Sequence, residues 1–563
     1  MSELFSYIDH ALAQELFEAA SPAAHSALAY LSAARRAGHL CIRVQEGGLH
    51  PAPGSLLSQE GEEPDLASLE EELLEGLRSL PEDVVGKDAS ATPVVHWGNL
   101  YYFQKAWAQE TSFLAHLERL LQGAPSLQIA REAVESAVRG LEDAKRLLPE
   151  QADAIRKVSQ GSLTLICGGP GTGKTYTAGQ CLRLLSDALA EEGRPLHVLL
   201  AAPTGKAAAN LQASLQKAMG GQGLAMTAQT LHGLLGIGRR QKRVGPLMAD
   251  LILVDECSMV DAGLMAELFA SVPSGARLVL LGDRYQLPPV ESGSFFSALA
   301  SGQSLSDCTV TLKTCVRAEL KGLVDVAERV KVGDSTFIED LCSGAFQGIG
   351  WRDFAAFESE RSFFNRALAD AAQPLFLSGP IGDPKQILQD LARFRLLCPL
   401  RKGPFGVESI NRLLGQVHRD HVRGLAIAPI MICKNDYRLG LFNGEVGALV
   451  RHPGDGMRDY ALFPGEGDEI RRLPALQLPQ YELAYCMSVH KSQGSEFNKV
   501  LLLLPPGSEW FGREVLYTGI TRSKQSLEIW ASRSVLGDTV ALESERLSGC
   551  VDRMIYRNST TSL

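Results

Sequence analysis

The octapeptide Gly168–Thr175, which reads Gly-Gly-Pro-Gly-Thr-Gly-Lys-Thr, constrains the fold of this chain more than any other stretch. It follows the apolar run Leu163–Ile166 and precedes a segment in which apolar residues recur at helical spacing. A strand, a glycine-rich loop and a helix N-terminus in this order form a cradle whose backbone N–H groups point at one anion. Lys174 then reaches the β- and γ-phosphates, and the Thr175 hydroxyl coordinates Mg²⁺. The sequence therefore predicts a binding site for a nucleoside triphosphate.

The composition is that of an ordinary globular protein, with 45% hydrophobic and 21% charged residues in a chain of 563 residues. This length predicts about three or four domains. Eleven cysteines without a C-x-x-C pair predict buried thiols in a reducing compartment, so we expect a cytoplasmic protein. The N-terminus lacks the pattern of a signal peptide, and no stretch approaches the ~20 apolar residues of a membrane span. The net charge of −10 argues against general coating of nucleic acid but permits a narrow basic channel.

Short apolar strands alternate with helix-length segments from Leu163 onward, which predicts βαβ units and parallel sheets covered on both faces. The first set of predicted strands comprises Leu163–Ile166, His197–Ala201, Leu251–Val254 and Leu278–Leu281. The second set begins near Val310 and continues through Phe394–Cys398, Val500–Leu504 and Ser526–Trp530. We therefore expect an α/β protein with two tandem parallel-sheet domains.

An N-terminal region and two insertions complete the predicted organisation. Residues 1–120 carry helical patterns and an acidic segment, 60–83, which is either a solvated helix face or a docking surface for a partner. Pro–Gly turns between short strands predict a small β insertion at about 437–480. Basic residues between glycines predict a short hairpin near 236–246. We expect a linker at 121–147, a first α/β domain at 148–303 and a second at 304–563.

Two carboxylates, Asp255 and Glu256, directly follow the predicted strand Leu251–Val254. A buried strand delivers Asp255 to the carboxyl edge of the sheet, where it can reach the Mg²⁺ shell. Glu256 is then placed to orient and deprotonate an attacking water. About eighty residues after a phosphate loop, this pair predicts hydrolysis of the nucleotide as well as its binding.

Three further candidates each allow two interpretations. Gln286 follows the next strand and is either a sensor of the γ-phosphate or part of a polar turn stiffened by prolines. Thr204 and Lys206 open a helix, where they either cap it or bind a backbone phosphate of nucleic acid. Arg522 either ends a surface helix or faces the nucleotide from a second domain, where an arginine stabilises developing charge.

These segments, in this order, resemble the superfamily 1 helicases and, more closely, the RecD family, the α subunit of exonuclease V. The resemblance covers about residues 148–535 and reaches the N-terminal region through residues 36–41 and 100–102. The segments most similar to RecD are 396–406, 435–437 and 441–445. The resemblance implies two RecA-like motor domains, the second carrying a β-barrel-like insertion, behind a mainly helical N-terminal domain that docks partners.

The resemblance also implies an ATP-dependent DNA helicase that moves 5′ to 3′ on single-stranded DNA. Its implied partners are RecB-like and RecC-like subunits in a complex for recombination and double-strand-break repair. The implied catalytic residues are Lys174, Asp255, Glu256, Gln286, Arg317 and Arg522. The implied nucleotide-binding residues are Gln151, which reads the adenine edge, with Gly168, Gly169, Pro170, Gly171, Thr172, Gly173, Lys174, Thr175, Tyr176 and Gly494. Mg²⁺ is assigned to Thr175 and Asp255, and single-stranded DNA to Pro203, Thr204, Lys206, Thr230, His232, Asn443, His490 and Ser492.

Other interpretations remain open at this level. The neighbours of Arg317, Val316 and Ala318, depart from the family pattern of an aromatic residue before the arginine and a Gln after it. A nucleotide-driven switch that binds nucleic acid without unwinding it, a free-standing RecD-like helicase and a structural subunit with an inactive ATPase are the alternatives. No second acidic cluster is evident, so we expect no nuclease centre in this chain.

Overall fold

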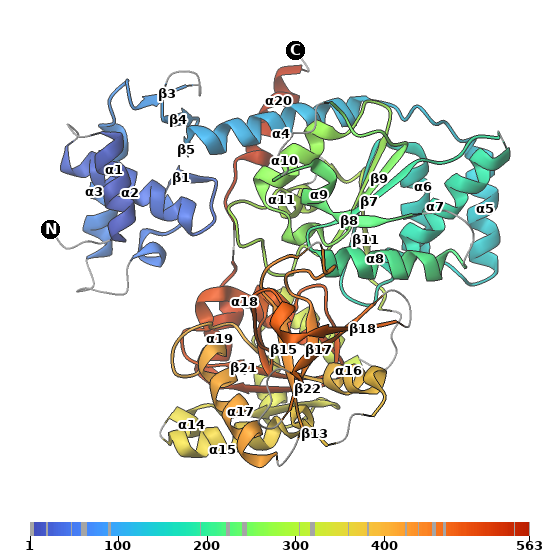
Figure 1. The fold of residues 1–563 in the computed structure, drawn as a ribbon. Helices are drawn as coiled ribbons and strands as arrows, with labels where there is room; N and C mark the ends of the chain where they lie inside the picture. Colours follow the sequence, from blue (N-terminus) through green and yellow to red (C-terminus); the bar gives the residue numbers. More distant parts are fainter. Residues whose placement is uncertain are drawn as a thin grey trace.

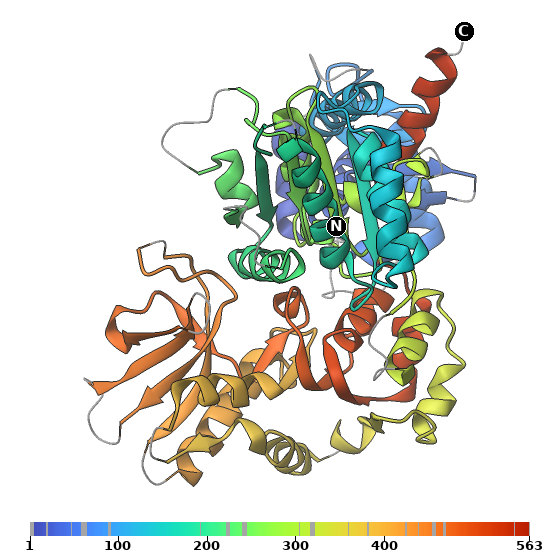
Figure 2. The same cartoon turned by 90° about the vertical axis from the view of Figure 1, so that its right-hand side faces the viewer.

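The computed structural model describes residues 5–17, 21–46, 48–57, 65–87, 92–191, 193–220, 226–238, 245–302, 305–315, 321–358, 360–379, 382–422, 425–436, 438–452, 458–465, 469–544 and 546–561. They form an N-terminal domain beside a first α/β lobe, with a second α/β lobe below (Figure 1). Figure 2 shows the two lobes stacked, with a β insertion at one side of the second lobe. Among the described residues, no helix has the length and apolar character needed to cross a bilayer.

The N-terminal domain combines helices with a five-stranded sheet of order β2-β1-β5-β4-β3. The sequence pattern predicted helices there but not this sheet, because its strands are only two to five residues long. The buried face of α2, rich in alanine, lets the neighbouring helices approach closely. Its elements are α1 (Tyr7–Leu16), α2 (Pro22–Arg36), β1 (Cys41–Gln45), β2 (Gly48–His50), η1 (Pro53–Leu56), α3 (Leu66–Arg78), β3 (Val85–Gly86), β4 (Val94–Trp97) and β5 (Leu100–Phe103).

The first lobe contains a parallel six-stranded sheet of order β11-β6-β10-β9-β7-β8. Alternate residues of its strands pack into two separate apolar clusters, so both faces are covered by helices. Its elements are α6 (Pro149–Gln160), β6 (Leu163–Gly168), α7 (Lys174–Glu191), β7 (Val198–Ala202), α8 (Gly205–Ala218), β8 (Ala228–Thr230), α9 (Leu231–Leu235), β9 (Leu251–Val254), η2 (Cys257–Met259), α10 (Ala262–Ser271), β10 (Arg277–Gly282), α11 (Phe295–Ser301) and β11 (Thr309–Leu312).

The second lobe contains a parallel five-stranded sheet of order β12-β22-β21-β14-β20, again with an apolar cluster on each face. Its elements before the insertion are α12 (Lys321–Lys331), α13 (Phe337–Cys342), β12 (Ile349–Arg352), α14 (Ala355–Glu358), α15 (Arg361–Ala371), η5 (Gln373–Leu375), β13 (Leu377–Ser378), α16 (Pro384–Arg393), β14 (Phe394–Cys398) and α17 (Val407–His421). Its elements after the insertion are β20 (Cys486–Ser488), η8 (His490–Ser492), β21 (Phe497–Leu504), η9 (Glu509–Phe511), α18 (Gly512–Ile520), β22 (Ser523–Ala531) and α19 (Arg533–Ala541).

The β insertion is antiparallel and begins earlier in the chain than the glycine–proline pattern predicted. Its first strand starts at Ala426, and the short β13 of the second lobe joins its edge. The insertion comprises β15 (Ala426–Ile432), β16 (Val446–Arg451), β17 (Tyr460–Pro464), β18 (Ile470–Pro474), η7 (Ala475–Gln477) and β19 (Tyr481–Leu483). The basic residues of the hairpin predicted near 236–246 lie outside the described residues.

The predicted domain boundaries differ from the structure at three places. The prediction of a second-lobe strand near Val310 is wrong, because β11 pairs in parallel with β6 at the edge of the first sheet. The predicted linker holds α5 (Arg131–Asp143), which packs on α6, and the preceding α4 (Gln104–Gln122) packs on α10. The last helix, α20 (Cys550–Thr561), leaves the second lobe and packs on α4 and α11.

A buried ion pair fixes this returning segment. Arg553 of α20 donates to Glu110 Oε1 of α4 at 3.0 Å, and both side chains are almost fully buried. Tyr102 and the Gly549 N–H donate to the same carboxylate, at 3.0 and 3.1 Å. Just before α20, the carbonyl oxygen of Leu547 accepts a hydrogen bond from the backbone N–H of Leu40 in the N-terminal domain, at 2.8 Å. The last helix therefore joins the N-terminal domain to the first lobe.

Candidate nucleotide and nucleic-acid site

The phosphate loop lies at the carboxyl edge of the first sheet, between the buried strand β6 and the first residue of α7. Gly171 and Gly173 have φ angles of 77° and 87°, a region that glycine enters without strain. Lys174 Nζ donates to the carbonyl oxygens of Gly168 and Gly169 at 2.6 and 3.2 Å. The ammonium is therefore held over the mouth of the loop.

Gln151 supports this loop from α6. Its Nε2 donates to Thr172 O at 3.2 Å, its Oε1 accepts from Leu148 N at 3.0 Å, and the side chain is buried. Thr172 in turn donates its hydroxyl to Gly169 O at 2.8 Å. These bonds fix the loop conformation, and recognition of adenine by Gln151 stays a prediction.

Two other residues assigned to the nucleotide contact different parts of the first lobe. The Tyr176 hydroxyl donates to Arg146 O at 3.1 Å, beside the start of α6. Gly494 belongs to the second lobe, has a φ of 69°, and its carbonyl accepts from Asn210 of α8 at 2.9 Å. Gly494 therefore contacts the first lobe directly.

The carboxylate pair follows β9, as the sequence predicted. Asp255 N donates to Ala201 O at 3.0 Å, which continues the sheet, and Asp255 Oδ1 accepts from Glu256 N at 2.8 Å. Glu256 has a φ of 53°, an uncommon left-handed conformation for a residue with a side chain. The backbone therefore turns sharply between the two carboxylates and separates their directions.

The electrostatics of this pair fit a bound cation. Burial, reinforced by the neighbouring Glu256 carboxylate, raises the pKa of Asp255 to about 7, while the Lys174 ammonium opposes the rise. A buried carboxylate whose ionised form is destabilised gains most from a nearby positive charge. Carboxylate and hydroxyl oxygens are the ligands that Mg²⁺ prefers, so Asp255 and Thr175 suit this ion.

The segment after β10 lies against the second lobe. Tyr517 of α18 donates its hydroxyl to Asp283 Oδ2 at 2.6 Å, and both residues are buried. Leu287 N donates to Thr518 Oγ1 at 2.9 Å, and Leu287 O accepts from Gln493 Nε2 at 3.0 Å. Three hydrogen bonds thus join the two lobes beside the phosphate loop.

Gln286 lies within this contact. Its side chain is 4% exposed, and its Oε1 atom is buried without a hydrogen-bond partner among the described residues. Buried polar atoms are normally paired, so this oxygen has acceptor capacity that no described residue uses. A role for Gln286 in sensing the nucleotide stays a prediction.

Arg522 lies at the same boundary between the lobes. Its guanidinium donates to Thr518 O, Ser495 O and Thr521 Oγ1 at 3.1, 3.2 and 3.1 Å. Ser495 Oγ accepts from Lys206 Nζ of the first lobe at 2.6 Å. Arg522 is therefore buried, bonded within its own lobe and one residue removed from the first lobe. The other predicted arginine, Arg317, lies outside the described residues.

Apart from Lys206, which bonds to Ser495 across the boundary, the residues assigned to DNA fall into two groups. Thr204 and Thr230 cap α8 and α9, with their hydroxyl groups accepting from Ala207 N and Gly233 N at 3.2 and 3.1 Å. Pro203 precedes the first cap, and the side chains of His232 and Asn443 are exposed. Capping therefore accounts for the two threonines and leaves their contact with DNA as a prediction.

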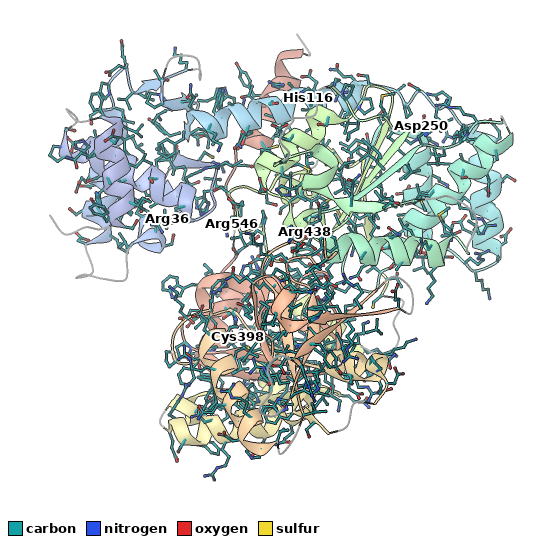
Figure 3. All side chains as sticks on the ribbon, in the orientation of Figure 1. Arg36, His116, Asp250, Cys398, Arg438 and Arg546 are labelled. Carbon is teal, nitrogen blue, oxygen red and sulfur yellow. The ribbon has the colours of Figure 1, made fainter. Side chains whose placement is uncertain are left out.

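The second group lies deeper. Ser492 is fully buried and donates its hydroxyl to Val489 O at 2.7 Å. His490 packs beside the ring of Phe511, with ring centroids 5.8 Å apart. Burial, assisted by the charge of Arg546, lowers the pKa of His490 to about 4, so the ring is neutral at pH 7. Arg546 lies near the centre of the molecule, where the three parts meet (Figure 3).

Sequence reasoning missed several residues of this site. Gln493 and Ser495 directly follow the predicted site residues His490 and Ser492, and Tyr517 lies five residues before Arg522. Their place in these two segments could have identified them. Asp283 follows a predicted strand and carried the same signal as Asp255. Nothing in the sequence marked Lys331, which reaches the phosphate loop from α12 of the second lobe.

Comparison with known proteins gives three matching family models. Residues 2–102 match the N-terminal domain of RecBCD enzyme subunit RecD, residues 146–345 match an AAA domain, and residues 483–529 match a UvrD-like helicase C-terminal domain.

Curated relatives match over most of the chain. RecBCD enzyme subunit RecD of Mycolicibacterium smegmatis is 31% identical over 81% of this chain and 83% of its own length. The protein of the same name from Mycobacterium tuberculosis (strain CDC 1551 / Oshkosh) is 33% identical over 81% of each chain. ATP-dependent RecD2 DNA helicase of Deinococcus radiodurans is 31% identical over 68% of this chain but only 48% of its own length. The three family models fall on the N-terminal domain and on both lobes of this chain.

Proposed function

This chain belongs to the RecD family, and we propose that it is an ATP-dependent DNA helicase acting as the RecD-like subunit of an exonuclease V complex. It moves on single-stranded DNA, in the 5′-to-3′ direction, beside RecB-like and RecC-like subunits. The match of residues 2–102 to the RecD N-terminal domain favours the subunit over a free-standing helicase. The observation that carries the motor function is the Asp283–Tyr517 bond, which joins the two lobes beside the phosphate loop.

The first lobe binds the nucleotide. Its loop N–H groups and Lys174 receive the phosphates, while Thr175 and Asp255 hold Mg²⁺. When bound, the ion neutralises charge on the β- and γ-phosphates. Glu256 accepts a proton from the attacking water, whose oxygen bonds to the γ-phosphorus as the bond to ADP breaks. Gln286 orients the reacting groups with its unpaired amide oxygen.

The second lobe makes hydrolysis depend on closure. Arg522 lies at the boundary with only neutral oxygens of its own lobe as partners, so its positive charge is available to the nucleotide when the lobes close. The bonds Lys206–Ser495 and Leu287–Thr518 form only when the lobes are together. Nucleotide state is thereby coupled to lobe position, as in other enzymes whose closure completes the site.

DNA lies across both lobes near Lys206. Each lobe holds the strand in turn, so that repeated closing and opening of the lobes moves the protein along it. Contacts to the phosphate backbone carry no base information, so binding is salt-dependent and nearly independent of sequence.

Strand displacement tests the proposal. Duplexes with a 5′ or a 3′ single-stranded tail are incubated with ATP and the chain, alone and with RecB-like and RecC-like subunits. The expected result is ATP-dependent unwinding from the 5′ tail. DNA-stimulated hydrolysis without displacement of either duplex, in both preparations, would instead establish the switch protein.

A further inference from the structure

Lys331, the last residue of α12, faces the phosphate loop from the second lobe. A Cβ atom built on Gly169 would lie 3.9 Å from Lys331 Nζ. Lys174 Nζ of the first lobe donates to the carbonyl of the same Gly169 at 3.2 Å. Two ammonium groups, one from each lobe, thus converge on one residue of the loop.

Two aromatic rings hold the Lys331 ammonium in this position. Its Nζ lies 5.1 Å from the ring centroid of Tyr285 and 5.3 Å from that of Tyr517. The faces of such rings attract a cation without neutralising it. The side chain is only 12% exposed, so its direction is set by packing against the lobe boundary.

The negative groups around Lys331 leave its charge available. Glu328 Oε1 lies 2.5 Å away on the same helix, but that carboxylate is 58% exposed, and such pairs contribute little in water. The other nearby carboxylate, Asp283, already accepts from Tyr517 Oη at 2.6 Å and from Tyr285 N at 3.2 Å. Glu328 is therefore the one weak competitor for this ammonium among the described ion pairs.

A structural role at the contact between the lobes is the simpler explanation, and packing against Tyr285 and Tyr517 fits it, but the pair with Glu328 does not account for the direction of the side chain. An i,i+3 pair with Glu328 needs no contact with the other lobe. The ammonium nevertheless points at the glycine loop that receives phosphate groups, and a doubly or triply charged phosphate outcompetes an exposed carboxylate for it.

We propose that Lys331 is a catalytic residue that contacts the terminal phosphate of the bound nucleotide from the second lobe. This inference rests on the proposed function. In hydrolysis, water oxygen bonds to the γ-phosphorus, the bond to the β–γ bridging oxygen breaks, and ADP leaves. Lys331 keeps its proton throughout and stabilises the charge on the transferring group, as preorganised cations do in phosphoryl transfer.

The test compares Lys331→Met with Lys331→Arg, using Lys321→Met as the matched control. Lys321 is an exposed lysine at the opposite end of α12. Steady-state hydrolysis is measured with saturating single-stranded DNA. Affinity is measured separately for ADP–Mg²⁺ and for ADP–Mg²⁺ with aluminium fluoride, which imitates the transferring phosphoryl group.

We expect Lys331→Met to lower kcat about 100-fold, the usual effect of removing one such group. Its affinity for the aluminium fluoride complex falls by a similar factor, while its affinity for ADP changes less than about twofold. Lys331→Arg keeps part of the activity, and Lys321→Met matches the wild type.

Three outcomes would overturn the inference: unchanged kcat in Lys331→Met, equal loss of affinity for both nucleotide complexes, or a Lys331→Arg variant as inactive as Lys331→Met while folded. Equal loss with a lowered melting temperature would identify a structural role. Failure of the proposed function is recognised separately, because the wild-type chain would then displace neither duplex, whatever the Lys331 variants do to hydrolysis.

Discussion

The hydroxyl of Tyr517 donates to Asp283 Oδ2 at 2.6 Å, and a Cβ atom on Gly169 would lie 3.0 Å from that hydroxyl oxygen. One hydrogen bond therefore connects the second lobe, the first lobe and the edge of the phosphate loop. Any nucleotide group that displaces Tyr517 or Asp283 also changes the contact between the lobes. The Asp283–Tyr517 bond is therefore a specific contact through which nucleotide hydrolysis and lobe movement are coupled.

Replacing Tyr517 by Phe tests this coupling. The substitution leaves a buried Asp283 oxygen without its donor, at a cost of about 1–3 kcal/mol in the closed state. We expect basal ATP hydrolysis to stay within a few-fold of the wild type and stimulation by single-stranded DNA to fall about tenfold. Hydrolysis rates with and without oligonucleotide measure the ratio, and an unaltered ratio contradicts the coupling role.

Replacing Lys174 by Ala tests the phosphate site. Lys174 Nζ is bonded to two loop carbonyls rather than to the core, so the fold should survive its removal. We expect the rate of ATP hydrolysis to fall at least about 100-fold, because the principal positive charge on the β- and γ-phosphates is lost. Circular dichroism and the melting temperature provide the control. Wild-type turnover in this variant would refute the assigned site.

The pH dependence of DNA binding tests Lys206. Burial, and secondarily the charge of Arg395, lowers the pKa of Lys206 to about 8. The side chain is therefore charged below pH 8 and neutral above it, and only the charged form binds a phosphate strongly. We expect affinity for single-stranded DNA at constant ionic strength to fall about tenfold as the pH rises from 7 to 9.

Two variants serve as references for this titration. Lys206→Arg stays charged throughout, so its affinity should change little with pH, and Lys206→Met should bind weakly at every pH. Fluorescence anisotropy of a labelled oligonucleotide gives the affinities. A wild-type profile as flat as that of Lys206→Arg would remove Lys206 from the DNA path.

Replacing Arg553 by Met tests the returning helix α20. The change leaves the buried Glu110 carboxylate without its cation, which costs about 3–5 kcal/mol. We expect faster hydrogen exchange in α20 and in the facing part of α4. The matched control is Arg557→Met, whose ion pair with Glu118 is exposed and worth at most ~1 kcal/mol. Equal exchange in the two variants would show that the buried pair does not hold the helix.

Local patterns predicted the core of each motor lobe well. The strands β6, β9, β10 and β14 were predicted from runs of apolar residues, and the loop after β6 from its glycines. Such runs suffice because a parallel strand buried on both faces has few alternatives. The carboxylates that follow β9 were placed at the sheet edge by the same logic.

Long-range relationships could not be predicted in this way. Tyr517 and Asp283 are separated by 234 positions in the chain, so no local pattern links them. The sequence of β11 is a short apolar run that would fit either sheet. Only its pairing with β6 assigns it to the first lobe. Lys331 ends an ordinary amphipathic helix, and its approach to Gly169 exists only through the docking of two lobes.

The return of α20 to the first lobe means that the polypeptide crosses between the lobes twice, once after β11 and once before α20. A body attached by two covalent strands can swing about the line through its attachment points but cannot swivel freely. The second connection therefore limits how far the second lobe can rotate relative to the first, beyond the limit set by the chain after β11. Cutting the chain between α19 and α20 would release that restriction while leaving every residue of the nucleotide site in place.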